Sequence, residues 1–288
     1  MIRPLVLLLA LSLPLPAFGS VLTVASWNME WFTLRPAGDP SLPASVKPKR
    51  PEDIARLRAY ADILNADVVA MEEVDGPEAA AEVFTPDRYV LQFTSDKVVQ
   101  RVGLAIRRGI AFTANPDLTA LDPYPPDAPE QLRSGADVTL HLGGADLRIL
   151  AVHLKSGCWE VPLDENRPAC RVLREQLPVL ERWIAARRRA GTPFLIIGDF
   201  NRVLGPDEDF LAGLDKMAPL AVATEGVRNP CWGGRYSTFI DQILAGDEAR
   251  HWMEKGSFRV LVYRETAPIW RERLSDHCPV IVDFRLPN

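Results

Sequence analysis

The stretch Phe194-Leu195-Ile196-Ile197-Gly198-Asp199-Phe200-Asn201 decides how the rest of the chain is interpreted. Its first four residues are apolar, which is typical of a buried strand. An acid and an amide follow where that strand is expected to end. Because Asp and Asn favour turns, Asp199 and Asn201 taken alone predict only a turn. Other strands in the chain, however, carry polar residues in the same place.

Five further strand-like runs have polar side chains at their ends that a core would not accommodate. These are Asn28 and Glu30 after residues 21–26, Glu72 and Glu73 after 68–71, His153 after 147–152, Asp241 within 238–244, and Asp276 and His277 before 280–284. Strand ends at one edge of packed sheets converge in space. We therefore expect these groups to share one cleft.

The residue types in this set indicate a narrow range of chemistry. Carboxylate and amide oxygens are hard ligands that suit magnesium, calcium or manganese rather than zinc or copper. A divalent ion neutralises a phosphate, and a histidine held by a carboxylate can take a proton from water. The pattern predicts hydrolysis of phosphate esters. The chain contains neither a Walker-type Gly-rich loop nor a G-x-S-x-G elbow, which argues against a nucleotide-driven motor and a serine hydrolase.

At these positions the chain resembles the endonuclease/exonuclease/phosphatase superfamily, the group that includes DNase I and the major abasic-site endonucleases. The matching segments, in chain order, are Ser26-Trp27-Asn28, Glu72-Glu73-Val74, Val152-His153-Leu154-Lys155, Gly198-Asp199-Phe200-Asn201, Ile240-Asp241-Gln242-Ile243 and Ser275-Asp276-His277. Each segment is weak alone, but together they extend over nearly the whole chain. The resemblance implies an α+β fold, a four-layer α/β/β/α sandwich of two mixed sheets flanked by helices.

The resemblance also implies a metal side of the site. Glu73 matches the family glutamate that binds the metal, Asn28 the asparagine beside it, and Asp276 a second carboxylate on the metal side. The implied ion is Mg2+, with Mn2+ or Ca2+ as alternatives. Where the family usually has a Gln-Glu pair, this chain has Glu72-Glu73. The extra carboxylate, that of Glu72, has two interpretations: a metal ligand or a solvent-facing group.

The remaining matches imply roles at the water and the phosphate. Asp199 matches the residue that positions or deprotonates the attacking water, and Asn201 the residue that holds the phosphate. His277 resembles the histidine that contacts the scissile phosphate or acts as a base, and Asp241 the partner that orients it. Taken alone, a histidine at a strand end is more often solvated than catalytic; the order of the matching segments reverses those odds.

Two further matches are weaker. His153 resembles the second histidine of DNase-like branches, which serves as an acid or a phosphate ligand, and Arg133 an arginine that contacts the phosphate. The DNase-type glutamate that supports the first of the two histidines has no clear counterpart, because Gln100 or Arg101 stands in that region. The role of His153 as a general acid is therefore open.

Length and composition are compatible with one globular domain. The chain has 288 residues, of which 47% are hydrophobic and 25% charged, close to the soluble average. The net charge of −5 excludes a wholly basic surface but not a local basic groove. Ten strand-like runs and two amphipathic helical stretches predict two packed sheets covered by helices. The helical faces are Ile54, Leu57, Ala61 and Leu64, and Leu173, Leu177, Leu180 and Ile184, with Pro178 expected to kink or split the second helix.

The N-terminus has the pattern of a signal peptide. Arg3 precedes an apolar run over residues 5–17, and Ala17-Phe18-Gly19 fits a cleavage site, which places the cut after Gly19 and the mature domain at 20–288. A buried first helix is the less favoured alternative. We expect a secreted or periplasmic protein with no membrane anchor. Its four cysteines can pair, a local Cys158–Cys170 bridge being preferred over a zinc site.

The sequence thus predicts a secreted, metal-dependent phosphodiesterase, acting as a monomer and most simply a nuclease with DNA or RNA as its substrate; no protein partner is inferred. A phosphatase or phosphodiesterase for lipid headgroups or small phosphate esters is the alternative, since one fold serves many substrates. A catalytically dead binding module is a third reading. For the tryptophans that flank the candidate residues, a core or rim position is the favoured interpretation, and a base-stacking or lipid-contacting role is the alternative; they are Trp27, Trp31, Trp159 and Trp232.

Overall fold

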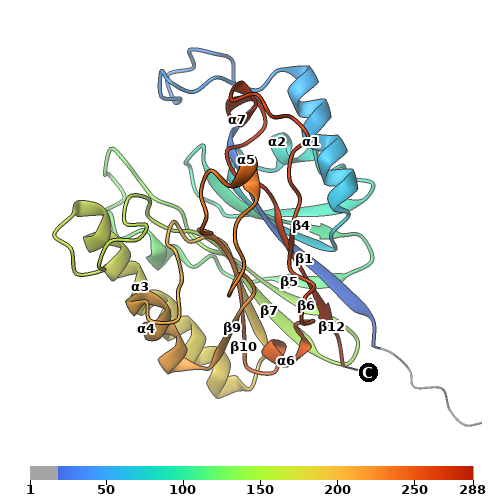
Figure 1. Ribbon diagram of the computed structural model, residues 1–288, viewed down its shortest axis with the longest axis vertical. Coiled ribbons are helices and arrows are strands. Elements are labelled where there is room, and N and C mark those ends of the chain that lie inside the picture. Colours follow the sequence, from blue (N-terminus) through green and yellow to red (C-terminus); the bar gives the residue numbers. More distant parts are fainter. Residues whose placement is uncertain (1–18, 288) are drawn as a thin grey trace, which may run out of the picture.

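The computed structural model describes residues 19–287, and two mixed six-stranded sheets lie face to face at its centre (Figure 1). The strands of the first sheet, in spatial order, are β11 (Arg259–Val260), β12 (Val280–Arg285), β1 (Val21–Phe32), β2 (Val68–Val74), β4 (Arg101–Arg107) and β3 (Tyr89–Phe93). Those of the second are β5 (Ala111–Ala114), β6 (Ala136–His141), β7 (Asp146–His153), β8 (Phe194–Asp199), β10 (Asp241–Gly246) and β9 (Leu220–Val222).

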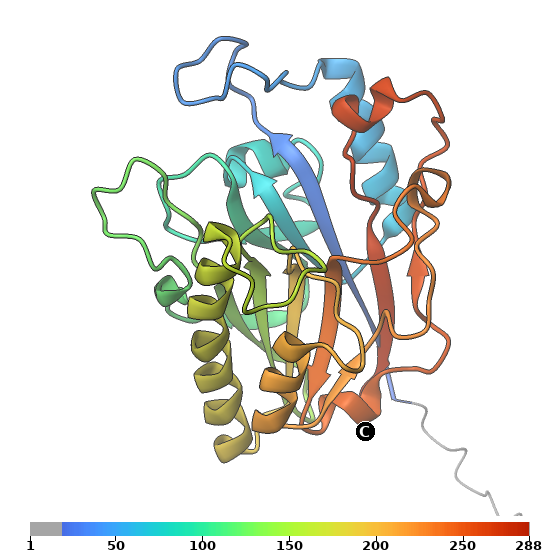
Figure 2. The ribbon, with the colours of Figure 1, turned by 60° about the vertical axis from the view of Figure 1, so that its left-hand side comes forward.

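Helices cover the outer face of each sheet, which Figure 2 shows from the side. The first sheet carries α1 (Pro51–Leu64) and α2 (Pro77–Ala81), and the second carries α3 (Pro168–Ala190) and α4 (Asp209–Met217). The shorter helices are η1 (Thr119–Leu121), α5 (Cys231–Gly234), α6 (Ala249–Trp252) and α7 (Ile269–Arg273). The predicted four-layer α/β/β/α sandwich is confirmed.

Three buried apolar layers hold the sandwich together. Between the sheets, Val24 and Val68 of the first pack in one cluster with Leu195 and Ile197 of the second. Alternate residues of the same strands face outward, so Ile196 packs beneath α3 and α4. A strand with both faces covered needs apolar residues at every position, which explains the uninterrupted run before Asp199. Burial of this apolar surface is the main stabilising contribution.

Two parallel strand pairs place the candidate residues. β1 pairs with β2 and β7 with β8 in parallel, and α1 and α3 provide the two crossovers. Because parallel strands end at the same edge of a sheet, Asn28 lies opposite Glu72 and His153 opposite Asp199. The antiparallel strand β10 begins there, with Asp241 on the other side of Asp199. The two sheets thus present their polar ends to one another.

Several local expectations need correction. α3 runs unbroken through Pro178 for 23 residues, so the predicted split is wrong. Its apolar face packs on the second sheet, and we attribute the helix's continuity to that packing, which outweighs a cost of about 3 kcal/mol for an internal proline. Residues 238–240, predicted as strand, precede β10. The strands β5 and β9 were not predicted, because with four and three residues they are too short to show an alternating pattern.

The predicted Cys158–Cys170 disulfide is confirmed, and Cys231 pairs with Cys278. No helix within residues 19–287 has the length and hydropathy needed to cross a membrane. The predicted signal peptide lies outside the described residues except for Gly19. Its cleavage, and the single domain at 20–288, stay predictions.

Candidate active site

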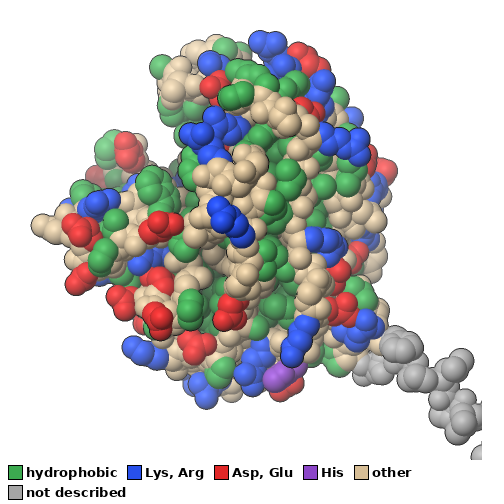
Figure 3. Space-filling view, viewed as in Figure 1, with side chains coloured by type: hydrophobic (Ala, Val, Ile, Leu, Met, Phe, Trp, Pro, Cys, Tyr) green, Lys and Arg blue, Asp and Glu red, His purple; other side chains and the backbone are tan. Residues whose placement is uncertain are grey.

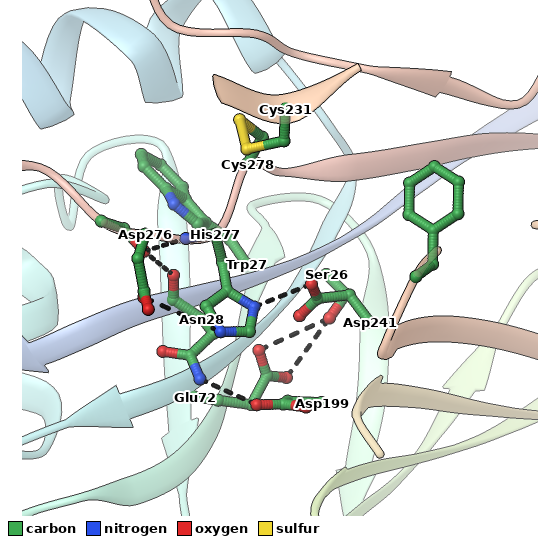
Figure 4. A network of polar contacts seen from close by, with 12 residues as sticks. Ser26, Trp27, Asn28, Glu72, Asp199, Cys231, Asp241, Asp276, His277 and Cys278 are labelled. Carbon is green, nitrogen blue, oxygen red and sulfur yellow. Dashed lines mark hydrogen bonds and ion pairs between the residues drawn. A yellow bond between two sulfur atoms is a disulfide. The ribbon is translucent and has the colours of Figure 1, made fainter. Parts of the chain in front are cut away.

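Asn28 connects the two sheets at the candidate site. It ends the regular part of β1, and its side-chain amide donates to Glu73 Oε1 at 3.1 Å and to Asp199 Oδ2 at 3.0 Å. The first acceptor lies near the end of β2 in one sheet, and the second ends β8 in the other. Figure 4 shows Asn28, Asp199, Asp241 and His277 turned toward one another. The expected convergence of strand ends is therefore present.

Unusual backbone conformations turn these side chains into the cleft. Glu73, at a register shift in β2, and Asn201, just after β8, both have left-handed φ angles, of 60° and 49°. Such angles cost free energy in residues other than glycine and collect at functional sites. Gly198 has φ 139°, and a Cβ there would lie 2.0 Å from the carbonyl oxygen of Val152. Only glycine fits between β7 and the acid that follows.

A histidine and two carboxylates form one side of the site. His277 Nδ1 lies 2.8 Å from Asp241 Oδ2. One side-chain nitrogen or oxygen from each of His277, Asp241 and Asp199, of the kind that can bind a metal, lies within 4.8 Å of the other two. Burial alone would lower the pKa of His277, but Asp241, Asp199 and Asp276 outweigh it and raise that pKa well above its usual value. The imidazole is thus held protonated, with a fixed orientation.

Asp199 is the most buried acid of this group. Burial raises its pKa to about 7, against the opposing effect of His277. Its Oδ1 accepts from the backbone N–H of Asn201 at 2.7 Å, and the Asn201 amide donates to Leu154 O at 3.1 Å. An oriented carboxylate with a pKa near neutrality can exchange a proton with water.

Acidic groups gather on the other side of Asn28. The Glu73 carboxylate accepts from the backbone N–H of Trp31 at 3.1 Å and from the amide of Gln100. Glu30 lies nearby, and burial raises its pKa to about 8 although Lys49 opposes the shift. Lys49 Nζ is 3.8 Å from Glu30 Oε2. The Asp276 side chain is half-exposed, with Oδ1 3.8 Å from His277 Nε2.

These residues suit a hard divalent cation. Three carboxylates, those of Glu30, Glu73 and Asp276, act on the buried ammonium of Lys49. Glu30 Oε2 and Asp241 Oδ1 are buried without a hydrogen-bond partner. Buried carboxylate oxygens are normally paired or bound to metal, and their chemistry matches Mg2+ and its relatives. Lys49 was missed by sequence reasoning because it comes from a Pro-rich loop with no local motif.

Comparisons with known proteins agree with this geometry. The sequence profile of the Endonuclease/Exonuclease/phosphatase family matches residues 25–277. The chain belongs to this family. It is a family of hydrolases that act on phosphoester bonds and generally depend on a divalent metal. A search of curated protein sequences found no match.

Solved structures of other family members share the fold. A 3′ phosphatase, NExo, from Neisseria, bound to a product DNA hairpin, has a TM-score of 0.60 at 14% identity, over 92% of this chain and 100% of that one. A humanized TDP2 from D. rerio gives 0.60 at 15%, over 92% and 99%. The human Nocturnin catalytic domain, with bound sulfate, gives 0.56 at 17%, over 92% and 94%. At these identities the likeness establishes the fold alone.

His153 lies beside two carboxylates of the site, those of Asp199 and Glu73. It is buried, with Nε2 3.6 Å from Asp199 Oδ2, while its Nδ1 has no hydrogen-bond partner. Burial, and then the neighbouring Arg133, lower its pKa well below the usual value. Gln100, in the region of the missing glutamate, instead joins Glu73 to Arg133, whose Nη2 donates to Gln100 Oε1 at 2.7 Å. The lowered pKa favours the neutral form of the His153 imidazole.

One of the two predicted positions of the Glu72 side chain, facing solvent, is wrong. Its carboxyl group is fully buried beneath the site, where Ser26 Oγ lies 3.4 Å from both of its oxygens, so it does not face solvent (Figure 4). It points between the sheets, on the opposite side of β2 from Glu73. Burial, and then Asp241 and Asp199, raise its pKa well above the usual value.

Replacing Glu72 with glutamine should stabilise the protein at neutral and alkaline pH. A raised native pKa means that the folded state keeps a proton that the unfolded state releases, so stability falls as the pH rises above the unfolded pKa of about 4.3. In Glu72→Gln that loss disappears, and its advantage grows by about 1.4 kcal/mol per pH unit until the native pKa is reached. Urea unfolding between pH 4 and 8 measures it. An advantage that does not change with pH would contradict the protonated Glu72.

The site opens to the surface. Figure 3 shows the molecule hollowed between the part that carries α1 and α7 and the arm that carries the loops before α3, with Lys and Arg side chains beside the hollow. A separate pocket of about 540 Å³ between α4 and β9 is lined by Leu211, Leu220 and Val227 and by no candidate site residue. An open site suits an extended substrate.

Proposed function

We propose that the protein is a secreted, divalent-metal-dependent phosphodiesterase that hydrolyses DNA or RNA at internal positions. The observation that carries this proposal is the bridge from Glu73 through Asn28 to Asp199, because it sets an acidic cation site directly beside a carboxylate with a pKa of about 7. The two disulfides, which pair all four cysteines, support export to an oxidising compartment.

The side chains divide the reaction between them. Glu73, Asn28 and Asp276, joined by Glu30, would hold Mg2+, which when bound supplies positive charge to a phosphate oxygen. Asp199 accepts a proton from water as the water oxygen forms a bond to phosphorus and the bond to the leaving ester oxygen breaks. Because only a deprotonated Asp199 can accept that proton, the step requires a pH near or above 7.

Four residues would hold the phosphate during this step. Asn201, His153 and Arg133 face Asp199 or Glu73 from one side, and protonated His277, oriented by Asp241, from the other. Two positive charges and two neutral donors stabilise the charge that develops on the phosphate oxygens.

Nucleic acid is the substrate that the surroundings favour. The site reaches the surface at the half-exposed Asp276 and does not line the pocket beside β9, so a polymer can approach it. The NExo structure was solved with a DNA hairpin, which supports the same class for this chain. Because NExo is described as a 3′ phosphatase, action on small phosphate esters remains the second candidate. We propose that the protein acts as a monomer, without a membrane anchor.

A substrate panel with defined ions tests the proposal. We expect plasmid, single-stranded DNA or RNA to be cut internally with Mg2+ or Mn2+, activity to be abolished by EDTA, and activity to return when the ion is added back. Asp199→Asn, purified in the same way, controls for contaminating nucleases. Release of phosphate from small esters without any cleavage of nucleic acid would favour the second candidate. Full activity in EDTA would contradict the metal-dependent mechanism.

A further inference from the structure

Trp159 is an exposed aromatic residue held rigidly beside the candidate site. Half of its surface, 51%, is exposed, although large apolar side chains are normally buried. Its indole Nε1 donates to Asn201 Oδ1 at 3.3 Å, and the Asn201 amide lies 3.2 Å from Asp199 Oδ2. The ring is therefore separated from the proposed water-activating carboxylate by one side chain. Within residues 19–287, no aromatic ring or guanidinium is stacked on it.

The loop that carries Trp159 is fixed from several sides. The preceding Cys158 is buried and bonded to Cys170 at the start of α3. The buried guanidinium of Arg202 donates to the carbonyls of Cys158 and Val161, each at 2.7 Å, so it spans the loop on both sides of the tryptophan. The Trp159 carbonyl accepts from Val203 N at 2.9 Å. An aromatic side chain on so constrained a loop loses little conformational entropy when a ligand covers it.

The surroundings of Trp159 match a nucleobase better than a lipid surface. Its neighbours Ser156, Gly157 and Glu160 are polar or small, and Glu160 bonds to Thr238 at 3.0 Å across the rim. A membrane-inserting loop would instead present several apolar residues together. A single flat ring with its N–H already engaged offers only its π-face, which is the surface that unpaired bases stack on.

We propose that Trp159 is a stacking platform that binds the unpaired base next to the scissile phosphate and so determines substrate specificity. The proposal rests on the proposed nuclease function. It predicts that single-stranded or locally unpaired nucleic acid is preferred to intact duplex, because a paired base cannot turn its face to the ring. Stacking would also set the distance between the phosphate and Asn201, whose side chain contacts the same indole.

Two substitutions separate stacking from support of Asn201. Trp159→Phe keeps an aromatic face but loses the bond to Asn201, while Trp159→Leu loses both. The substrates are a single-stranded oligonucleotide and the same strand with a tetrahydrofuran abasic residue beside the cleaved phosphate. In Trp159→Leu we expect kcat/KM to fall about tenfold more on the intact strand than on the abasic strand, and the difference to lie mainly in KM. Trp159→Phe should retain most of the preference for the intact strand.

The control is Trp252→Leu on α6, at the opposite end of β10, which should not change the substrate ratio. Tryptophan fluorescence measures binding of the intact strand without cleavage. The strand should quench the fluorescence of Asp199→Asn more strongly than that of Asp199→Asn/Trp159→Phe. An equal loss on both strands would show that Trp159 only supports Asn201 and overturn the platform. Equal cleavage of both strands by the unaltered protein would overturn the platform alone, and no cleavage of either would overturn the nuclease function as well.

Discussion

Replacing Asp199 with asparagine should lower kcat on any phosphodiester substrate by about a thousandfold, the scale of a lost general base. The substitution keeps the shape and most hydrogen bonds of the side chain but removes its ability to accept a proton. In the unaltered protein, kcat should fall as the pH drops through about 7, because burial raises the pKa of Asp199 to about that value and only the deprotonated form acts. That acidic limb should disappear in Asp199→Asn.

A second buried acid on the same sheet provides the matched control for Asp199. Asp137, on β6, is 4% exposed and pairs with Arg148 and with the indole N–H of Trp183, remote from the cleft. Asp137→Asn should lower the melting temperature and leave kcat nearly unchanged. Asp199→Asn should lower kcat and leave the melting temperature nearly unchanged. A variant at Asp199 with nearly normal kcat and an unchanged pH profile would remove this carboxylate from the mechanism.

Replacing His277 with alanine should lower kcat by about three to four orders of magnitude, since the variant loses both the charge held against the phosphate and the group that Asp241 orients. Asp241→Asn should have a smaller effect of the same kind. Residues that act as one unit are not additive. The double variant Asp241→Asn/His277→Ala should therefore be no slower than His277→Ala, which single-turnover kinetics can measure.

The chain contains a second histidine–carboxylate pair that serves as a control for this prediction. His141 Nδ1 lies 2.9 Å from Asp146 Oδ1 at the exposed turn between β6 and β7, far from the candidate site. His141→Ala should leave kcat unchanged although it removes a pair of the same geometry. If the losses at Asp241 and His277 instead add up fully in the double variant, the two residues act independently and the proposed orientation of the imidazole is wrong.

The fold and the centre of the site could be predicted because their determinants are local. A continuous apolar run such as 194–197 indicates a strand buried on both faces, and a polar residue directly after it must lie at the sheet edge. Asn28, Asp199 and His277 are all found this way. The family order of the motifs then predicts that these edges meet, which the bond from Asn28 to Asp199 confirms.

The residues that escaped prediction reach the site from loops or change direction at it. Lys49 lies in a Pro-rich loop and Gln100 just before β4, and nothing in the neighbouring sequence marks either as a partner of Glu30 or Glu73. The prediction that Glu72 faces solvent was wrong because its side chain lies on the same face of β2 as Ala70, between the two sheets. Tertiary contacts, rather than local pattern, determine where such side chains point.

The most direct test of the account is an anomalous difference map from crystals soaked in Mn2+. We expect a peak within coordination distance of the Glu73 carboxylate, beside Asn28 and Glu30. These oxygens hold the hard cation, while Asp199 stays free to take a proton from water. A peak centred instead among Asp199, Asp241 and His277, whose donor atoms also lie close together, would contradict this division of roles, as would the absence of any peak near Glu73.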